Sequence, residues 1–277
     1  MVRPALVPNM TRYDAVLEGG YRHPSKLFDA RKRERRAPLV CLCFPYAGGN
    51  GALFSDWGSL VSGSIDILAV NLPGRAKRFL DPPYLEFEDI LDDLEVAALP
   101  WLDRQFLLFG HSLGGLIAYE LAFRLESKHG FVATHLFVSG TNTPHWPDPP
   151  ESVIGRGDYE LGDAEFVAKL IELGGAPAEL ASNLELRDAT LPSIRADFRV
   201  YDSYVRSVSP GVRMLSCPIG VFGGRSDFRN VPEESLRDWS RYTRSSFSLH
   251  LLPGDHFFLR SSAREVTARM LASIARQ

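Results

Sequence analysis

The chain has 277 residues, of which 31 are Lys or Arg and 34 are Asp or Glu, so that its formal charge is -3. Its 45% hydrophobic and 23% charged residues are ordinary for a globular protein and exclude a disordered or fibrous class. The balanced charge leaves no overall basic field, and no nucleic-acid partner is expected.

The first 36 residues are polar and irregular, and they end in RKRERR, where five of the six residues are basic. We interpret residues 1–36 as an N-terminal extension, a solvated edge before the first strand, with contact to an acidic partner as the alternative. The first ten residues contain no apolar stretch long enough for a signal peptide, which favours a cytoplasmic protein. Residues 37–55 are uncharged, but Pro and Gly interrupt them, so that a strand and a loop are expected and no membrane span.

The three cysteines lie in apolar runs, at Cys41, Cys43 and Cys217. Their odd number favours small buried thiols in a reducing compartment. No His or further Cys stands at ligand spacing from them, and no metal site is expected.

Short apolar strands alternate with helical patterns from residue 37 onward. The predicted strands are Leu39–Phe44, Asp66–Leu72, Gln105–Phe109, His135–Ser139, Pro218–Phe222 and Ser248–Leu252. The predicted helices are Leu53–Leu60, Phe87–Ala98, Leu113–Leu125, Pro232–Tyr242 and Ala263–Ala275. This alternation predicts an α/β fold, with a mostly parallel sheet flanked by helices, over residues 37–277.

One long stretch, about 143–210, breaks the alternation. It opens with four prolines, at 144, 147, 149 and 150, and continues as two helical patterns, the first with Asp163 as its predicted cap. Because an insertion here would lie above the strand ends, where ligands bind in such folds, we expect a helical lid. An additional helical layer without a lid function is the alternative.

The sequence GHSLGG at Gly110–Gly115 fits the nucleophile-elbow pattern G-x-S-x-G. A predicted strand precedes it and a predicted helix follows it, which is the context that the pattern requires. Ser112 is therefore the predicted nucleophile, and the backbone N–H of Leu113 at the helix N-terminus is one predicted oxyanion donor. His111 is interpreted as a packed residue of the same turn.

A serine nucleophile needs a general base, and the base needs an orienting acid. In hydrolases with this elbow, the acid and then the histidine follow the serine in the chain, each on a loop after a strand. Asp227 and His256 meet these conditions and are the predicted acid and base. The other histidines outside the elbow precede the acid or lie within the last strand.

The second oxyanion donor is expected in the loop after the first strand, FPYAGGNG at Phe44–Gly51. Paired glycines allow the backbone to approach a substrate closely. The N–H of Ala47 is the predicted donor, with Tyr46 as the rival. A tight turn without a catalytic role is the alternative.

Five motifs together resemble the type II thioesterases of polyketide and nonribosomal peptide assembly lines. They are FPYAGG at Phe44–Gly49, LPGR at Leu72–Arg75, GHSLGG, LPSIRADF at Leu191–Phe198, and GDHFFL at Gly254–Leu259. The resemblance extends from about Pro38 to the C-terminus and implies an α/β-hydrolase fold with a lid. It implies an enzyme of antibiotic and other secondary metabolism that hydrolyses stalled or aberrant acyl groups from the phosphopantetheine arm of an acyl or peptidyl carrier protein.

On this resemblance Ser112 attacks the thioester, His256 moves the proton and later activates water, and Asp227 orients the imidazole. Arg75 is expected to shape a loop near the entrance. No metal and no organic cofactor is expected, because the serine and its relay supply the nucleophile and the proton transfers. A monomer that binds a carrier protein is predicted, with neither a membrane nor nucleic acid as partner.

Three lid residues, Phe166, Leu170 and Phe198, are predicted to line an acyl pocket, although apolar helical stripes are also typical of plain core. Four alternative functions stay open: a chain-releasing thioesterase, a general serine esterase that acts on oxygen esters, an acyltransferase and a non-catalytic binding module. The absence of an attached carrier domain disfavours the first. The complete set of serine, aspartate and histidine disfavours the last.

Overall fold

The computed structural model describes residues 26–28, 37–61, 63–147, 154–208 and 210–275. Most of the predicted N-terminal extension, with its basic run, lies outside these residues. Residues 148–153 of the predicted lid, which include two of its four prolines, also lie outside them. The boundaries proposed for these two segments stay predictions.

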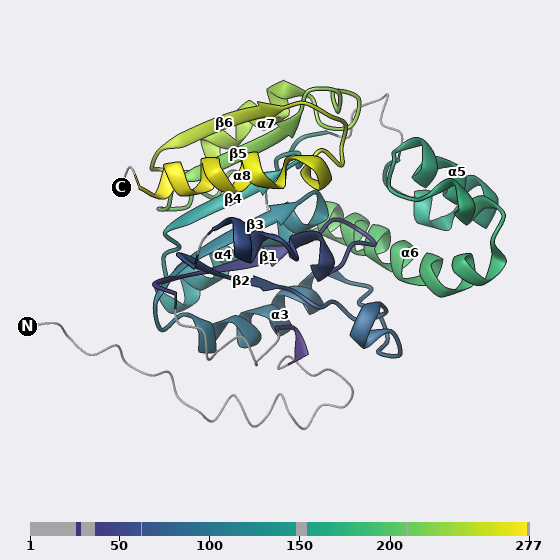
Figure 1. Cartoon of the computed structure of the whole chain (residues 1–277), viewed down its shortest axis with the longest axis horizontal. Helices are drawn as coiled ribbons and strands as arrows, with labels where there is room; N and C mark the ends of the chain where they lie inside the picture. The colour runs from purple at the N-terminus through teal and green to yellow at the C-terminus, as the bar shows by residue number, and fades with distance from the viewer. Residues whose placement is uncertain (1–25, 29–36, 62, 148–153, 209, 276–277) are drawn as a thin grey trace, which may run out of the picture.

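The described residues form a six-stranded sheet in the order β2-β1-β3-β4-β5-β6, and every neighbouring pair is parallel (Figure 1). The strands are β1 Leu39–Phe44, β2 Ile65–Ala69, β3 Gln105–His111, β4 His135–Ser139, β5 Ile219–Gly224 and β6 Phe247–Leu252. The predicted α/β class is confirmed. All six predicted strands are present.

Three strands, β2, β3 and β5, end at other residues than predicted, and β5 ends at Gly224 instead of Phe222. β2 ends at Ala69 and does not reach Leu72, because the N–H of Asn71 leaves the sheet and donates to the carbonyl of Leu27 (2.7 Å). β3 continues past Phe109 to His111, so that the strand leads directly into the turn at Ser112.

Side chains of each strand alternate between two hydrophobic cores, one on each face of the sheet. In β1, Val40, Leu42 and Phe44 belong to the core under α3 Phe87–Ala98 and α4 Leu113–His129. Leu39, Cys41 and Cys43 belong to the core under α2 Trp57–Leu60 and α8 Leu259–Ile274. Because both faces are covered, the inner strands β1, β3, β4 and β5 are almost completely buried, whereas β6 at the edge of the sheet is only partly buried.

Two predicted helices are interrupted. The predicted helix 53–60 is a 3-10 turn followed by α2, and the predicted helix 232–242 is α7 Glu233–Asp238 followed by a 3-10 turn. α4 runs beyond Leu125 to His129 and ends at Gly130, whose φ of +72° suits the left-handed cap that glycine favours. No helix among the described residues has the length and apolar composition to cross a membrane.

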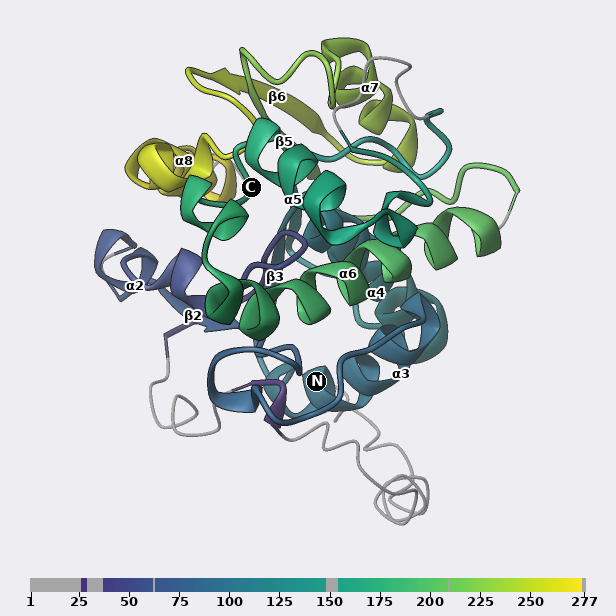
Figure 2. The same ribbon diagram turned by 90° about the vertical axis from the view of Figure 1, so that its right-hand side faces the viewer.

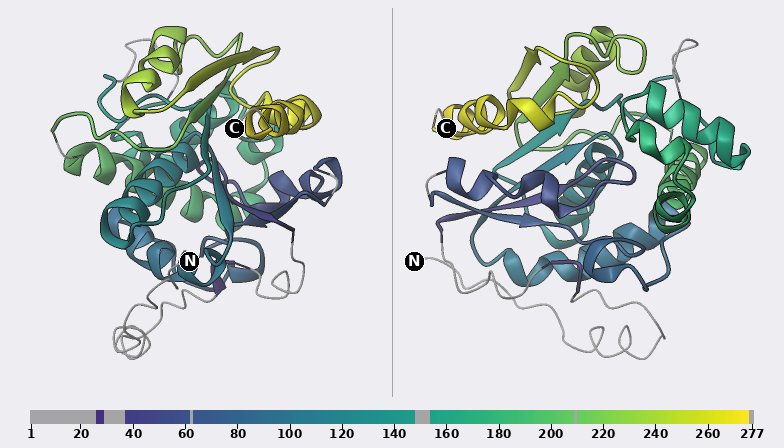
Figure 3. Two further views of the ribbon diagram at one scale, coloured as in Figure 1. Left: turned by 90° about the vertical axis from the view of Figure 1, so that its left-hand side faces the viewer. Right: turned by 45° about the vertical axis from the view of Figure 1, so that its right-hand side comes forward.

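Between β4 and β5 the chain forms α5 Asp163–Glu172 and α6 Leu184–Ser207, which lie in front of β3 when the molecule is viewed toward the strand ends (Figure 2). In the right-hand view of Figure 3, α5 lies away from the layers that flank the sheet. The C-terminal half of α6 packs against those layers, because its Val200 and Tyr204 belong to the core under α3 and α4. The two helices also enclose a small core of their own, around Phe166, Val167 and Leu180. The predicted insertion of helices at the strand ends is therefore present, and its function as a lid stays a prediction.

The prediction that Asp163 caps the first of these helices is wrong. Gly162 occupies the cap position, and Asp163 is the first helical residue. Its carboxylate instead accepts a hydrogen bond from Nη2 of Arg195 on α6 (2.7 Å), because tertiary contact with that guanidinium competes with the local cap.

Candidate active site

Ser112 connects β3 to α4 in a backbone conformation that residues other than glycine rarely adopt, with φ 55° and ψ -122°. Three hydrogen bonds hold it there. Its N–H donates to the carbonyl of Ser139 (2.8 Å), and its carbonyl accepts from the N–H of Gly115 (2.8 Å) and from Oγ1 of Thr141 (3.0 Å). A strained residue persists only where its surroundings determine it in this way.

The glycines on both sides of Ser112 lie where no side chain fits. A Cβ on Gly110 would lie 1.9 Å from the carbonyl oxygen of Gly114, and a Cβ on Gly114 would lie 2.2 Å from that of Phe44. The start of α4 is thus in close contact with the end of β3, which precedes it in the chain, and with the end of β1. This close packing explains why the turn needs glycine at both positions.

His256 and Asp227 lie within hydrogen-bond distance although 29 residues separate them, with Nδ1 of His256 2.7 Å from Oδ2 of Asp227. Both are buried, at 7% and 2% exposure. The second carboxylate oxygen, Oδ1, accepts from Nδ2 of Asn230 (3.0 Å). Hydrogen bonds to both carboxylate oxygens therefore orient Asp227. No pattern in the sequence indicated that Asn230 would supply one of them.

The loops after β5 and β6 are bonded to each other, and this brings the two side chains together. The N–H of Arg225 donates to the carbonyl of Leu252 (2.8 Å), and that of Ser226 donates to the carbonyl of Gly254 (2.9 Å). Gly224 lies so close to the second loop that a Cβ there would be 2.2 Å from the carbonyl oxygen of Asp255.

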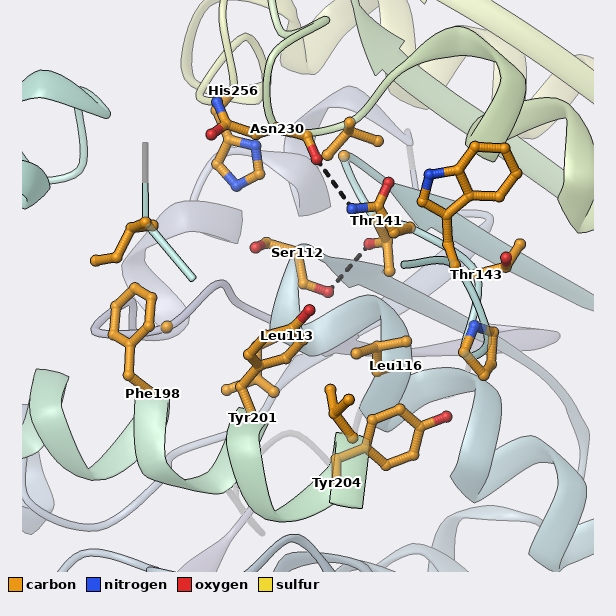
Figure 4. A pocket seen from close by; sticks show the side chains of 18 of the residues that line it. Ser112, Leu113, Leu116, Thr141, Thr143, Phe198, Tyr201, Tyr204, Asn230 and His256 are labelled. Carbon is orange, nitrogen blue, oxygen red and sulfur yellow. Dashed lines mark hydrogen bonds between the residues drawn. The ribbon is translucent and has the colours of Figure 1, made fainter. Parts of the chain in front are cut away.

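Ser112 and His256 line one cavity of about 110 Å³, and residues of α6 form part of its wall. Figure 4 shows Phe198, Tyr201 and Tyr204 rising from α6 toward the space beside them. A smaller cavity of about 80 Å³ also contains both residues in its wall. The serine and the histidine thus lie where the two cavities meet.

The three predicted acyl-pocket residues separate in the structure. Phe198 lines both cavities, and Leu170 lines the smaller one. Phe166 is in the wall of neither; it is fully buried in the core of the helical insertion, edge-on to Phe198 (ring centroids 5.5 Å apart) with the guanidinium of Arg195 4.6 Å from its ring. Trp146 and Tyr204 also line the larger cavity and were not predicted.

Ala47 and Leu113 both line the larger cavity, from the loop after β1 and from the first residue of α4. Tyr46, the rival of Ala47, lines the smaller cavity. Its ring packs against Phe257 (centroids 4.9 Å apart), and its hydroxyl accepts from Nη2 of Arg260 (2.9 Å).

His111 is fully buried beside the serine, with Nδ1 2.9 Å from Oγ of Ser139. Burial lowers the pKa of its imidazole well below the ordinary value, and the neighbouring His256 lowers it further. His111 is consequently neutral at physiological pH, which agrees with its predicted packing role.

Among the described residues no group of three or more His, Cys, Asp or Glu is arranged to hold a metal ion. Cys41, Cys43 and Cys217 are all buried, as their apolar surroundings in the sequence predicted. Burial raises the pKa of the Cys217 thiol to about 12, so that it is a poor nucleophile at neutral pH.

A parallel sheet with a strained serine between its third strand and the following helix defines the α/β-hydrolase fold. Residues 40–274 match the family model described as thioesterase domain, and the chain belongs to this family. It is a hydrolase of thioester bonds.

Solved structures of pathway thioesterases share the fold of this chain. RedJ, a thioesterase of the prodiginine biosynthetic pathway of Streptomyces coelicolor, is 33% identical with a TM-score of 0.75, over 84% of this chain and 89% of that one. The type II thioesterase BorB of the borrelidin biosynthetic cluster is 30% identical with a TM-score of 0.73, over 85% and 92% of the two chains. The predicted resemblance to type II thioesterases is confirmed.

One sequence relative is named for a different activity. The protein named linear gramicidin dehydrogenase LgrE, from Brevibacillus parabrevis, is 35% identical over 249 residues, which are 88% of this chain and 91% of that protein.

Proposed function

We propose that the protein is an editing thioesterase, which hydrolyses stalled or aberrant acyl groups from the phosphopantetheine arm of acyl or peptidyl carrier proteins in assembly-line biosynthesis. The observation that supports this best is the hydrogen bond between His256 and the buried Asp227, on loops that bring the histidine to the same cavity as Ser112. The similarity to BorB supports the type II role.

In the proposed reaction the carboxylate of Asp227 accepts a hydrogen bond from Nδ1–H of His256, which keeps that proton on Nδ1 and leaves the lone pair of Nε2 available as the base. Oγ of Ser112 bonds to the thioester carbonyl carbon while His256 takes its proton, and the π electrons of the carbonyl move to its oxygen. Collapse of this adduct breaks the C–S bond. The thiolate of the arm receives the proton from His256, and an acyl-serine ester remains.

Water then completes the cycle. His256 removes a proton from the water as its oxygen bonds to the acyl carbon, and returns the proton to Oγ of Ser112 as the ester bond breaks. The backbone N–H groups of Ala47 and Leu113 are the proposed donors to the oxyanion in both halves. Each such donor contributes on the order of 3 kcal/mol to transition-state stabilisation.

The two cavities beside Ser112 suit a substrate that extends in two directions from its reacting carbon. We assign acyl-chain contact to Phe198 and Leu170, because both lie in cavity walls. Phe166 is given no substrate contact, since it is buried in the core of the insertion.

The test is hydrolysis of short acyl groups from a phosphopantetheinylated carrier protein, compared with acyl-CoA and p-nitrophenyl esters. Ser112→Ala is expected to lower kcat by about 10⁶-fold with the fold intact. The matched control is Ser59→Ala, which changes an exposed serine of α2 and is expected to leave kcat unchanged. Turnover in Ser112→Ala equal to that of the control would exclude the serine mechanism.

The substrate panel separates the alternatives. Preference for p-nitrophenyl esters over carrier-bound thioesters would favour a general esterase, and exclusive release of a full-length product chain would favour a chain-releasing thioesterase. A dehydrogenase activity is not proposed, because Gly48, Gly49 and Gly51 after β1 lack the G-x-G-x-x-G spacing of a dinucleotide site. A monomer is proposed, to be measured by light scattering.

A further inference from the structure

Two of the sequence motifs have no part in the proposed chemistry, yet they meet in the structure. Arg75 of LPGR and Asp197 of LPSIRADF lie 122 residues apart and form two hydrogen bonds, from Nη1 to Oδ2 (2.5 Å) and from Nη2 to Oδ1 (2.7 Å). Their side chains are 8% and 4% exposed. Because burying two charges is costly in itself, stability alone is a weak explanation for this pair.

The pair is also bonded to the loop after β1. Oδ2 of Asp197 accepts from the N–H of Gly48 (2.6 Å). Nη1 of Arg75 donates to the carbonyl of Gly49 (3.1 Å), and its Nε donates to the carbonyl of Pro73 (3.2 Å). The two side chains therefore bind two peptide groups of the loop that contains Ala47, namely Ala47–Gly48 through its N–H and Gly49–Asn50 through its carbonyl.

Gly48 and Gly49 are the last two residues of a tight turn that begins at Tyr46. The N–H of Gly49 donates to the carbonyl of Tyr46 (2.8 Å), and Gly48 at the third position has a φ of +77°, as a type II turn requires. Rotation of the middle peptide, between Ala47 and Gly48, would convert the turn to type I. That rotation would direct the Ala47 carbonyl toward the carboxylate of Asp197 and repel it.

We propose that Asp197 and Arg75 are positioning residues of the oxyanion site: Asp197 locks the turn that presents the Ala47 N–H, and Arg75 neutralises the carboxylate beside the developing oxyanion. This inference rests on the proposed role of Ala47. The pair also connects the loop that contains Ala47 to α6, since Asp197 directly precedes Phe198, a residue of the cavity wall, on that helix.

The inference orders the effects of three variants. Asp197→Asn keeps an acceptor oxygen for the Gly48 N–H and is expected to retain most of kcat. Arg75→Met leaves a buried carboxylate unpaired beside the site, and it is expected to lose the most. The double variant Arg75→Met/Asp197→Leu removes both charges and the acceptor at similar volume, so that it folds even where Arg75→Met does not. It is expected to lose about 10²-fold in kcat with little change in KM, because a misplaced catalytic group of this kind costs about that much.

The matched control is Asp202→Asn, also a buried carboxylate of α6, whose ion-pair partner is Arg206 one turn further along the same helix (2.7 Å). It makes the same chemical change without contact to the turn, and its kcat is expected to be unchanged. Thermal unfolding of each variant separates loss of structure from loss of catalysis.

A second readout reports the oxyanion site directly. A trifluoromethyl ketone adds Oγ of Ser112 to its carbonyl carbon and places an oxyanion where the tetrahedral intermediate has one, the serine proton passing to His256. In the double variant its affinity is expected to fall by about the same 10²-fold factor as kcat. A folded double variant with wild-type kcat, or one whose inhibitor affinity falls no more than its affinity for substrate, would overturn the inference.

The substrate in all these assays is p-nitrophenyl butyrate, because its hydrolysis needs the oxyanion site but no carrier protein. If the wild-type protein hydrolyses this ester and not carrier-bound thioesters, the editing function fails while the positioning inference is still tested. If the carrier reaction holds and the double variant performs it at the wild-type rate, only the positioning inference fails.

Discussion

Substitution of Gly114 by Ala is expected to push the start of α4 away from the turn that contains Ala47. A Cβ at this second residue of α4 would lie 2.2 Å from the carbonyl oxygen of Phe44 and 2.5 Å from that of Pro45. Both obstacles are backbone atoms, which cannot rotate away as a side chain can. The residues they belong to lead directly into the turn that contains Ala47, so that α4 and this turn must move apart.

The expected free-energy change is the difference of two terms. Replacing Gly by Ala within a helix contributes about 1 kcal/mol of stabilisation. Overpacking costs about 1–3 kcal/mol, and contact with rigid backbone places Gly114→Ala at the upper end. The net loss of about 2 kcal/mol corresponds to a fall in Tm of about 4–8 °C for a chain of this size. A displacement of about 1 Å is expected to lower kcat by about 10²-fold.

Thermal unfolding and hydrolysis of p-nitrophenyl butyrate measure the two effects. The control is Gly58→Ala in α2, where a Cβ would meet no atom within 4 Å. Without a clash only the helix term remains, and Gly58→Ala is expected to be as stable as the wild type or slightly more so, with unchanged kcat. If Gly114→Ala matches Gly58→Ala in both measurements, the close approach of α4 to β1 does not constrain the site.

Three further predictions concern single side chains. Asp227→Asn is expected to lower kcat by about 10⁴-fold with little change in Tm, because the amide favours the wrong imidazole tautomer; equal kcat in the two proteins would remove Asp227 from the mechanism. Burial raises the pKa of the Glu120 carboxyl, so the folded protein binds this proton more tightly than the unfolded chain, and stability declines as pH rises above the ordinary Glu value of about 4.3. Glu120→Gln should flatten that decline, measured as urea midpoints at about pH 5 and about pH 8, and an unaltered slope would contradict the assignment. Phe198→Ala should raise KM for longer acyl chains more than for acetyl, whereas Phe166→Ala should mainly lower Tm, and identical effects of the two would contradict their different places in the insertion.

The strands and the serine turn were predictable because their signals are local. Phe106–Phe109 is a continuous apolar run before a glycine, and the glycines at 110 and 114 surround a serine that a sharp turn exposes. The boundaries were less predictable, since β2 ends where Asn71 finds a partner in Leu27, which lies far earlier in the chain. Asp163 failed as a cap for the same kind of reason, as it binds Arg195.

The candidate acid and base were located from their order in the chain and their positions on loops after predicted strands, and their catalytic roles stay predictions. Chain order specifies which loops Asp227 and His256 occupy, but not that Asn230 binds the second carboxylate oxygen. The acyl-pocket prediction was less specific, because Phe166 and Phe198 belong to the same kind of apolar helical stripe. Only the packing of α5 against α6 decides which ring faces the core and which faces the cavity.

By itself the sequence determined the α/β class, the serine turn and the order of the candidate catalytic residues, because strand and helix periodicity and glycine turns depend on neighbouring residues. The tertiary structure decided the pairing of Arg75 with Asp197, the contact of that pair with Gly48, and the division of lid residues between core and cavity. The first two join groups more than a hundred residues apart, and the third depends on how α5 packs against α6. Such groups are brought together only when the sheet and the helical insertion are packed, and no local pattern in the chain encodes which of many Arg and Asp side chains will then meet.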